Sequence, residues 1–248
     1  MPHAPPAGLR PSAISVAERL SEHVLGQMTP GMRLPSESDL AERYGVSRVT
    51  MREAVKMLAG RGLLDVARGR RAIVRQPDGS VFAEFLTSLL RTDPKCLFDL
   101  IQVRRSLEIQ SVTMAARQAS RAGLMAAEAA LERMRAAAAE VNKNAEGAEL
   151  RFHQADVEFH EAIALASGNR VLSYLFEGMA SALRESFHAS RRGQQLRGVT
   201  LKQSVAAHTH ILACVKAGDA KGATEAMTRL IDDAERDIRA AYGPPVTL

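Results

Sequence analysis

The chain has 248 residues, a hydrophobic content of 46%, an aromatic content of only 4% and a formal net charge of +5. No apolar run approaches the roughly 20 residues that cross a bilayer, and the N-terminal residues lack the apolar stretch of a secretory signal. These features exclude a membrane protein and predict a cytoplasmic one, in which the two isolated cysteines are ordinary thiols.

The positive charge is concentrated near the N-terminus. Residues 1–80 hold 12 of the 33 Lys and Arg and 8 of the 28 Asp and Glu, a balance of +4. The rest of the chain carries 21 Lys and Arg and 20 Asp and Glu, a balance of +1. Such an asymmetry is typical of a nucleic-acid-binding module that is joined to a near-neutral partner domain.

Turn-forming residues divide the chain into segments. The Pro-rich residues 1–11 are expected to be a disordered tail, residues 12–76 a small unit of helices with a hairpin, and residues 77–81 a linker. Residues 82–241 are rich in Ala and Leu, and short breaks such as Arg192-Gly193 separate long helical stretches, which predicts an all-α antiparallel bundle. The helices expected in this bundle are 82–91, 97–120, 123–140, 147–167, 170–190, 199–217 and 220–241.

The first unit begins with an amphipathic helix, which Pro30-Gly31 ends. The apolar positions of this helix are Ile14, Ala17, Leu20, Val24 and Leu25. Ser36 is then placed to cap a second helix, with an acidic residue three positions further on. Tyr44-Gly45 supplies a tight turn, because glycine tolerates a positive φ, and Ser47 caps a third helix.

The third helix has two different faces. The residues expected in its core stripe are Met51, Val55 and Leu58. The residues expected to face outward are Arg48, Arg52 and Lys56. A helix that reads DNA does so from its N-terminal turns, so Arg48, Thr50 and Arg52 are candidates for base contacts. On spacing alone, a solvated helix face explains these arginines equally well.

A short hairpin follows, in which two apolar stretches flank the basic tip Arg68-Gly69-Arg70-Arg71. Such a tip can enter a minor groove or follow the phosphates of a duplex. An ordinary exposed hairpin is the alternative. A helix, a turn, a helix and a basic hairpin in this order indicate a DNA-binding module.

Residues 12–75 resemble the winged helix-turn-helix of the GntR family of bacterial transcription regulators. The matching residues are Gly31-Met32-Arg33-Leu34-Pro35-Ser36-Glu37, Leu40-Ala41, Val46-Ser47-Arg48, Arg52-Glu53-Ala54, Leu58 and Gly62-Leu63. Because members of this family bind operators as dimers, the resemblance implies a homodimer on double-stranded operator DNA. The DNA contacts that it implies are Arg48, Thr50 and Arg52, and the wing around Arg68 and Gly69. Arg33, Ser47 and Arg70 complete the set of residues predicted to bind DNA. The wing departs from the family at Arg71, where a second glycine is usual.

The bundle contains a candidate metal site. Asp156 and His160 are four residues apart, so a helix places both side chains on one face, and His208 belongs to another expected helix. A carboxylate with imidazoles suits Zn, Ni or Mn. On spacing alone, such a pair is more often a surface ion pair or a hydrogen-bonded core group.

Residues 84–240 resemble the all-helical ligand-binding domain, called FCD, of the FadR branch of the same family. The cues are Leu100 to Glu108, Ala115-Ala116, Asp156 to His160, Gly168-Asn169, His208 and Gly218-Asp219. Many such domains bind a divalent metal through one Asp and three His, with a small carboxylate effector against it. The resemblance implies Asp156, His160 and His208 as metal ligands, and the same three residues with Arg104 as the effector site.

The fourth ligand of this pattern falls at Leu230, which cannot bind a metal. Three possibilities remain open: Asp233 replaces it, waters or effector oxygens complete a three-ligand site, or the metal has been lost and the effector binds directly. His153 is separated from His160 by about 10 Å of helix rise and is expected to lean away from the site. His210 is expected on another face than His208.

The predicted fold class is mainly α: a winged helix-turn-helix with a small β-hairpin wing, followed by a helical bundle for effector binding and dimerisation. The predicted function is that of a ligand-responsive transcription regulator, by default a repressor that a small carboxylate metabolite releases, and not an enzyme. A metal-dependent hydrolase or lyase is one alternative, although no general base stands out. An effector-free architectural DNA-binding protein is the other, although it would not need so large a second domain.

Overall fold

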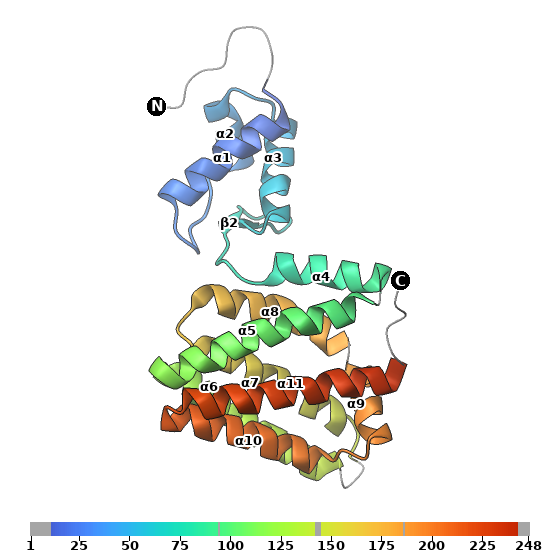
Figure 1. Ribbon diagram of the computed structural model, residues 1–248. Coiled ribbons are helices and arrows are strands. Elements are labelled where there is room, and N and C mark those ends of the chain that lie inside the picture. The colour runs from blue at the N-terminus through green and yellow to red at the C-terminus, as the bar shows by residue number, and fades with distance from the viewer. Residues whose placement is uncertain (1–10, 94, 142–144, 186, 243–248) are drawn as a thin grey trace. The chain divides into compact units, whose positions relative to one another are not determined.

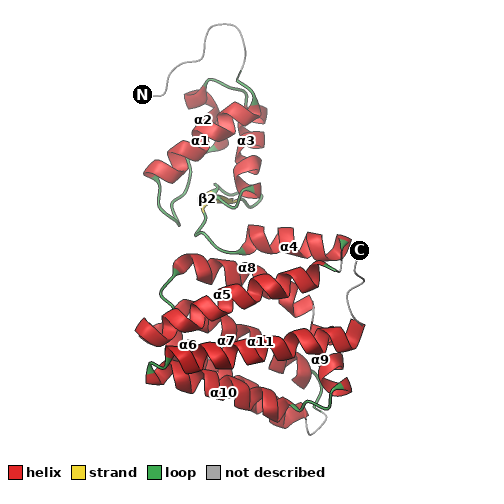
Figure 2. Cartoon of the chain, viewed as in Figure 1, coloured by secondary structure: helices red, strands yellow, loops and turns green. Residues whose placement is uncertain are grey.

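The computed structural model describes residues 11–93, 95–141, 145–185 and 187–242 (Figure 1). Helices dominate these residues, and a two-stranded antiparallel hairpin accompanies them (Figure 2). The chain forms two compact units, residues 1–81 and residues 82–248. The predicted mainly α fold class is therefore confirmed. None of the helices in the described ranges is long and apolar enough to cross a membrane.

From residue 11 onward, the N-terminal unit contains three helices and the hairpin. Its elements are α1 (Ala13–Gln27), α2 (Glu37–Tyr44), α3 (Arg48–Gly60), β1 (Leu64–Asp65) and β2 (Ile73–Val74). Ser36 caps α2 in a reciprocal arrangement with Asp39, and Gly45 ends that helix at a φ of 65°. The hydroxyl of Ser47 accepts a hydrogen bond from the backbone N–H of Thr50 at the start of α3. The predicted caps and turn of the helix pair are therefore confirmed.

The core of this unit corrects one expectation about α1. Ile14 and Leu25 were expected inside but are 57% and 69% exposed. The buried positions of α1 are Val16, Ala17, Leu20 and Val24. These four residues form a narrow stripe along one side of the helix, and Ile14 and Leu25 fall outside it. In α3 the expected stripe is buried, and Arg48, Arg52 and Lys56 are exposed.

The hairpin is extended by the segment that precedes α2. Leu64 pairs with Val74 in the antiparallel ladder, and Arg33 forms a further bridge to Ile73. Because side chains alternate along an extended segment, Leu34 is buried in the core while Arg33 is exposed. Gly69 adopts a φ of 74° at the tip of the wing, a conformation that favours glycine.

The described residues of the second unit form helices joined by short connections (Figure 1). They are α4 (Ser80–Thr92), α5 (Cys96–Gln118), α6 (Arg121–Val141), α7 (Ala148–Ala166), α8 (Arg170–Glu185), α9 (Phe187–Leu196), α10 (Leu201–Ala217) and α11 (Ala220–Tyr242). Helix α6 packs along α7, and α11 packs against α5, α9 and α10. Helix α4 begins at Ser80, inside the segment that was expected to be a linker.

The helix expected at 170–190 is found as α8 and α9, on either side of residue 186, which lies outside the described residues, and α9 runs on to Leu196. Arg192-Gly193, expected to be a break, lies inside α9. A Cβ atom on Gly193 would lie 1.8 Å from the carbonyl oxygen of Asp237 on α11. The missing side chain therefore serves the close approach of two helices and not a turn.

We predict that Gly193→Ala lowers the free energy of unfolding by about 1–3 kcal/mol, because α9 must move away from α11 to make room for the methyl group. Urea denaturation of the two proteins measures the difference. Gly60→Ala, at the end of α3, is the matched control because no atom outside the local backbone of its own helix lies within 4 Å of the added Cβ. Equal effects of the two substitutions would contradict the argument from close packing.

Candidate functional site

A cavity of about 340 Å³ lies inside the helical unit. Helices α5, α7, α8, α9, α10 and α11 all contribute to its lining. Cavities of this size hold small organic ligands. Apolar side chains such as Ile101 and Leu183 form part of the wall, and histidines, arginines and aspartates form the rest.

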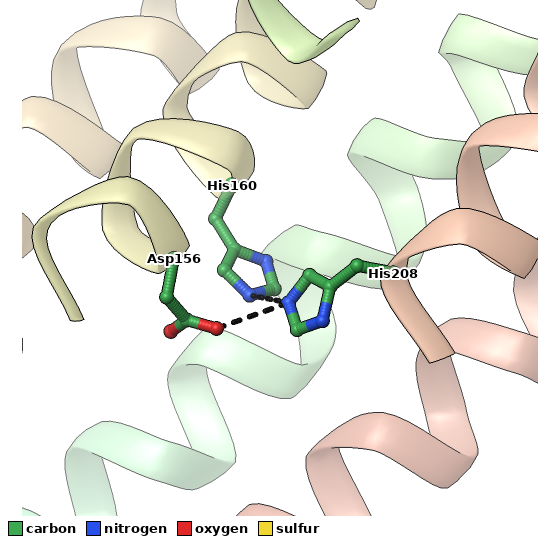
Figure 3. Close-up of side chains that lie close together, drawn as sticks. All are labelled: Asp156, His160 and His208. Carbon is green, nitrogen blue, oxygen red and sulfur yellow. Dashed lines mark hydrogen bonds and ion pairs between the residues drawn. The ribbon is translucent and has the colours of Figure 1, made fainter. Parts of the chain in front are cut away.

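Asp156, His160 and His208 meet at this cavity (Figure 3). One ligand atom of each lies within 4.8 Å of the other two. Oδ1 of Asp156 is 3.1 Å from Nε2 of His208, and the Nε2 atoms of the two histidines are 3.4 Å apart. Helix α7 supplies Asp156 and His160 one turn apart, and α10 supplies His208. The structure thus brings together the three residues that were singled out as metal ligands.

Each of the two imidazole rings has a polar contact at Nδ1, on the side that faces away from the cluster. Nδ1 of His208 donates a hydrogen bond to the carbonyl oxygen of Ser204 at 2.8 Å, and Nδ1 of His160 lies against Oε2 of Glu108. Each ring therefore turns Nε2 toward the cluster, where its lone pair is available. The ring of Phe159 packs edge-on against both imidazoles, with centroids 5.8 and 4.9 Å away, which restricts their rotation.

The charges of the cluster depend on each other. Burial alone would raise the pKa of Asp156, but the hydrogen bond and the charge of His208 hold this pKa well below its usual value. Burial alone would lower the pKa of His208, but Asp156 outweighs it and raises this pKa. For His160, burial outweighs the attraction of Glu108 and lowers the pKa. The cluster thus needs positive charge between Asp156 and His208, from a proton or from a bound cation.

Glu108 was not singled out as a site residue in the sequence. It is only 1% exposed, and its two carboxylate oxygens contact Arg104 and His160. Burial opposes its ionisation, but Arg104 and His160 outweigh burial and lower the pKa of Glu108. A carboxylate behind a histidine orients that histidine in many metal sites. The available signal was the four-residue spacing of Arg104 and Glu108 on one helix.

Arg104, expected at the effector site, lines the cavity from α5. Its side chain is 12% exposed, and its Nε donates a hydrogen bond to Oε1 of Glu108. The structure therefore places a partly buried arginine beside the Asp–His–His cluster. The carboxylate of Glu108 connects Arg104 to the imidazole of His160.

The residues considered as fourth ligands lie outside the cluster. Leu230 lines the cavity from α11 and offers no donor atom. Asp233 lines it too, but its Oδ1 is 3.0 Å from both Arg197 and Arg236. His153, which was expected to lean away, does line the cavity, although it is not part of the cluster. In the described part of the chain, the group close enough to hold an ion consists of Asp156, His160 and His208.

These observations fit a divalent cation. The donor set is one carboxylate and two imidazoles, converging from two helices, with both rings oriented by groups behind them. Without a cation or a proton, the two facing lone pairs at 3.4 Å would repel each other. The cluster is therefore a candidate site for a metal ion with three protein ligands.

A separate hollow of about 750 Å³ lies in the N-terminal unit. It is formed by the start of α2, the outer face of α3 and the wing, and we call it the basic groove. The cationic residues that line it are Arg48, Arg52, Lys56, Arg68, Arg70 and Arg71. The described structure thus brings the arginines of α3 and of the wing to one surface, as a DNA-binding interface requires.

The other residues expected at DNA lie beside this groove or within its wall. Gly69 is part of its lining. Ser47 and Thr50 lie outside the lining, and their hydroxyl groups are 2.8 Å apart at the start of α3. Arg33 is exposed on the segment that pairs with β2, also outside the lining.

Comparison with known proteins agrees with both halves of this description. Residues 13–74 match the bacterial regulatory proteins of the gntR family, and residues 99–233 match the FCD domain. The Glc operon transcriptional activator of Escherichia coli (strain K12) is 32% identical over 207 residues, 83% of this chain and 80% of that protein. The galactonate operon transcriptional repressor of the same organism is 27% identical, over 87% of this chain and 91% of that protein.

A solved structure shares the architecture. Streptococcus agalactiae GntR superposes with a TM-score of 0.70 at 25% identity, and the match covers 90% of this chain and 99% of that one.

A winged DNA-binding unit joined to an all-helical ligand-binding unit defines a ligand-responsive transcription regulator rather than an enzyme. The chain belongs to the GntR family, and its FCD domain agrees with the FadR branch. Members of this family bind operator DNA, and FCD domains bind small effectors and often a metal ion. The predicted family resemblance is confirmed.

We predict that Glu108→Gln weakens the binding of Zn²⁺ or Ni²⁺ about 10- to 100-fold, because a neutral amide holds Nδ1–H of His160 less strongly than a carboxylate does. Competition with a chromophoric chelator measures the affinity. Glu132→Gln on α6, whose side chain is 69% exposed, is the control and should bind the ions as the unaltered protein does. An unchanged affinity of a folded Glu108→Gln protein would show that Glu108 does not orient the site.

Proposed function

We propose that this protein is a homodimeric regulator whose affinity for operator DNA depends on a small carboxylate bound in the helical cavity. The observation that carries the proposal is the Asp156–His160–His208 cluster, with its oriented imidazoles, in a cavity that also contains Arg104. In this proposal, residues 12–76 bind DNA, residues 77–81 connect the domains, and residues 82–241 bind the effector and dimerise. The protein acts in the cytoplasm, where its operator is.

Asp156, His160 and His208 would hold a divalent ion, for which Zn, Ni and Mn are the candidates. Such an ion would supply positive charge and open coordination positions for carboxylate or hydroxyl oxygens. Leu230 leaves the fourth position of the family pattern without a protein donor. Asp233 is committed to two arginines, which favours water or the effector at that position.

The effector in this proposal is a small hydroxycarboxylate. Arg104 uses its Nε for Glu108, and the rest of its guanidinium group would bind a carboxylate of the effector. The volume of about 340 Å³ suits a molecule of this size. The operon that one relative represses is named for galactonate, an acid of this class.

On the DNA side, each protomer would read one half of a pseudo-palindromic operator. We assign base contacts to Arg48, Thr50 and Arg52 of α3. Arg68, Gly69 and Arg70 of the wing would contact the minor groove or phosphates, and Arg33 and Ser47 would contact the backbone of the duplex. The positive lining of the basic groove supports this assignment.

Effector and operator would affect each other reciprocally, because both bind one protein with two states of different DNA affinity. We take release of repression by the effector as the default sign. One similar protein is named an activator and another a repressor, so relatives of both signs exist. The alternatives of an enzyme or of an effector-free architectural protein require no such coupling.

We predict that the protein, purified without chelator and then incubated with Zn²⁺, Ni²⁺ or Mn²⁺, retains about one equivalent of ion per protomer, because three donors converge on one point. Elemental analysis after desalting measures the content. His208→Ala should lose the bound ion, whereas His210→Ala, two residues along α10 and outside the cluster, should retain it. Equal metal contents in both variants would contradict the assignment of His208.

We predict that a hydroxycarboxylate such as galactonate, lactate or citrate changes the affinity for selected operator DNA by about 5- to 150-fold, and that this DNA changes the affinity for the same acid by the same factor. Fluorescence anisotropy measures the first effect, and calorimetry with and without DNA measures the second. Arg104→Ala should abolish the effect of the acid and leave DNA affinity in its absence unchanged. Equal effector affinity with and without DNA would refute the regulatory mechanism.

A further inference from the structure

The basic groove contains one carboxylate, that of Glu37, the first residue of α2. Its Oε2 accepts a hydrogen bond from Nε of Arg52 on α3 at 2.9 Å. A negative charge on a surface that binds phosphates opposes association with DNA. Its presence among the arginines of the groove therefore needs a reason other than affinity.

Stability of the fold is not a sufficient reason. The side chains of Arg52 and Glu37 are 55% and 37% exposed, and ion pairs between exposed side chains contribute little to stability. A negative charge near the start of α2 also interacts favourably with the helix dipole. Asp39 already supplies such a charge in the first turn, together with the cap on Ser36.

The geometry of the bond gives a more specific reason. Because Glu37 occupies Nε of Arg52, the Nη1 and Nη2 edge of the guanidinium group remains for another partner, and no second ion pair of Arg52 occurs in the described residues. Two donors of an arginine can bond O6 and N7 of guanine together. Such bidentate readout depends on the orientation of the guanidinium plane.

Arg52 differs in this respect from the other arginines of the groove. Within the described ranges, Arg48, Arg68, Arg70 and Arg71 have no acidic side chain at ion-pair distance. Their guanidinium groups can follow phosphates in several orientations, which suits contacts that carry no sequence information. In the described part of the groove, the arginine that an ion pair orients is thus Arg52, on the helix assigned to base reading.

We propose that Glu37 is a positioning residue that sets base specificity without touching DNA, by fixing the guanidinium group of Arg52 for bidentate contact with one guanine. This inference rests on the proposed function of Arg52 in reading DNA. It has a distinctive consequence, because removal of the charge of Glu37 changes affinity and discrimination in opposite directions. Affinity for DNA of any sequence rises, while the preference for one base falls.

The experiment selects DNA from a randomised duplex pool with the full-length protein and then measures binding of single-base variants of the selected site. Arg52→Ala identifies the guanine position that Arg52 reads. Glu37→Gln should reduce the preference for guanine at that same position roughly three- to tenfold and strengthen binding to unselected duplex. In the Arg52→Ala background, Glu37→Gln should cause no further loss of preference.

Glu53→Gln is the matched control. It removes the same charge from an exposed residue that pairs with Lys56 on α3 and lies outside the lining of the groove. It should leave the preference at the guanine position unchanged. A thermal melting curve of each variant shows whether the fold is retained.

The possible outcomes separate the inference from the function on which it rests. If Arg52→Ala relaxes a guanine position and Glu37→Gln does not, Arg52 reads DNA and the positioning role of Glu37 is wrong. If Arg52→Ala relaxes no position, both the reading role and the inference are wrong. Loss of preference at all positions together, with a lowered melting temperature, would show that Glu37 only supports the fold.

Discussion

The candidate metal site of the helical unit depends on two contacts behind two imidazole rings. Ser204 holds Nδ1 of His208, and Glu108 holds Nδ1 of His160, so that both Nε2 atoms face Asp156. These contacts require α5, α7 and α10 to keep their mutual spacing, because each supplies one side of the arrangement. The packing of α11 against α5 and α10 therefore supports the site as well as the core.

Features that arise from neighbouring residues were predictable. The caps at Ser36 and Ser47, the turn at Gly45 and the buried stripe of α3 follow from spacing along one or two helical turns. The proximity of Asp156 and His160 was predictable in the same way, because one helix carries both residues four positions apart. Its meeting with His208, 48 residues further on, was expected only through the resemblance to FCD domains.

Features that depend on packing between distant segments were not predictable from one sequence. The sequence indicated only that Glu108 is close to an arginine on the same helix. Its contact with His160 arises because α7 packs against α5. Gly193 looked like a helix break, because glycine at a turn and glycine at a close helix contact are alike in sequence. The buried face of α1 was predicted too wide for the same reason, because the packing of α1 on α3 decides which of its apolar residues are buried.

Leu230 has a consequence for how such a domain changes over evolutionary time. Its neighbour Ile231 is fully buried and anchors α11 in the core, whereas Leu230 is only partly buried and lines the cavity. Two adjacent positions of α11 thus differ: Ile231 anchors the helix in the core and Leu230 lines the cavity. Substitution at Leu230 can therefore alter the chemistry of the cavity while the packing of α11 stays the same. Related domains with one fold can in this way evolve specificity for different metabolites.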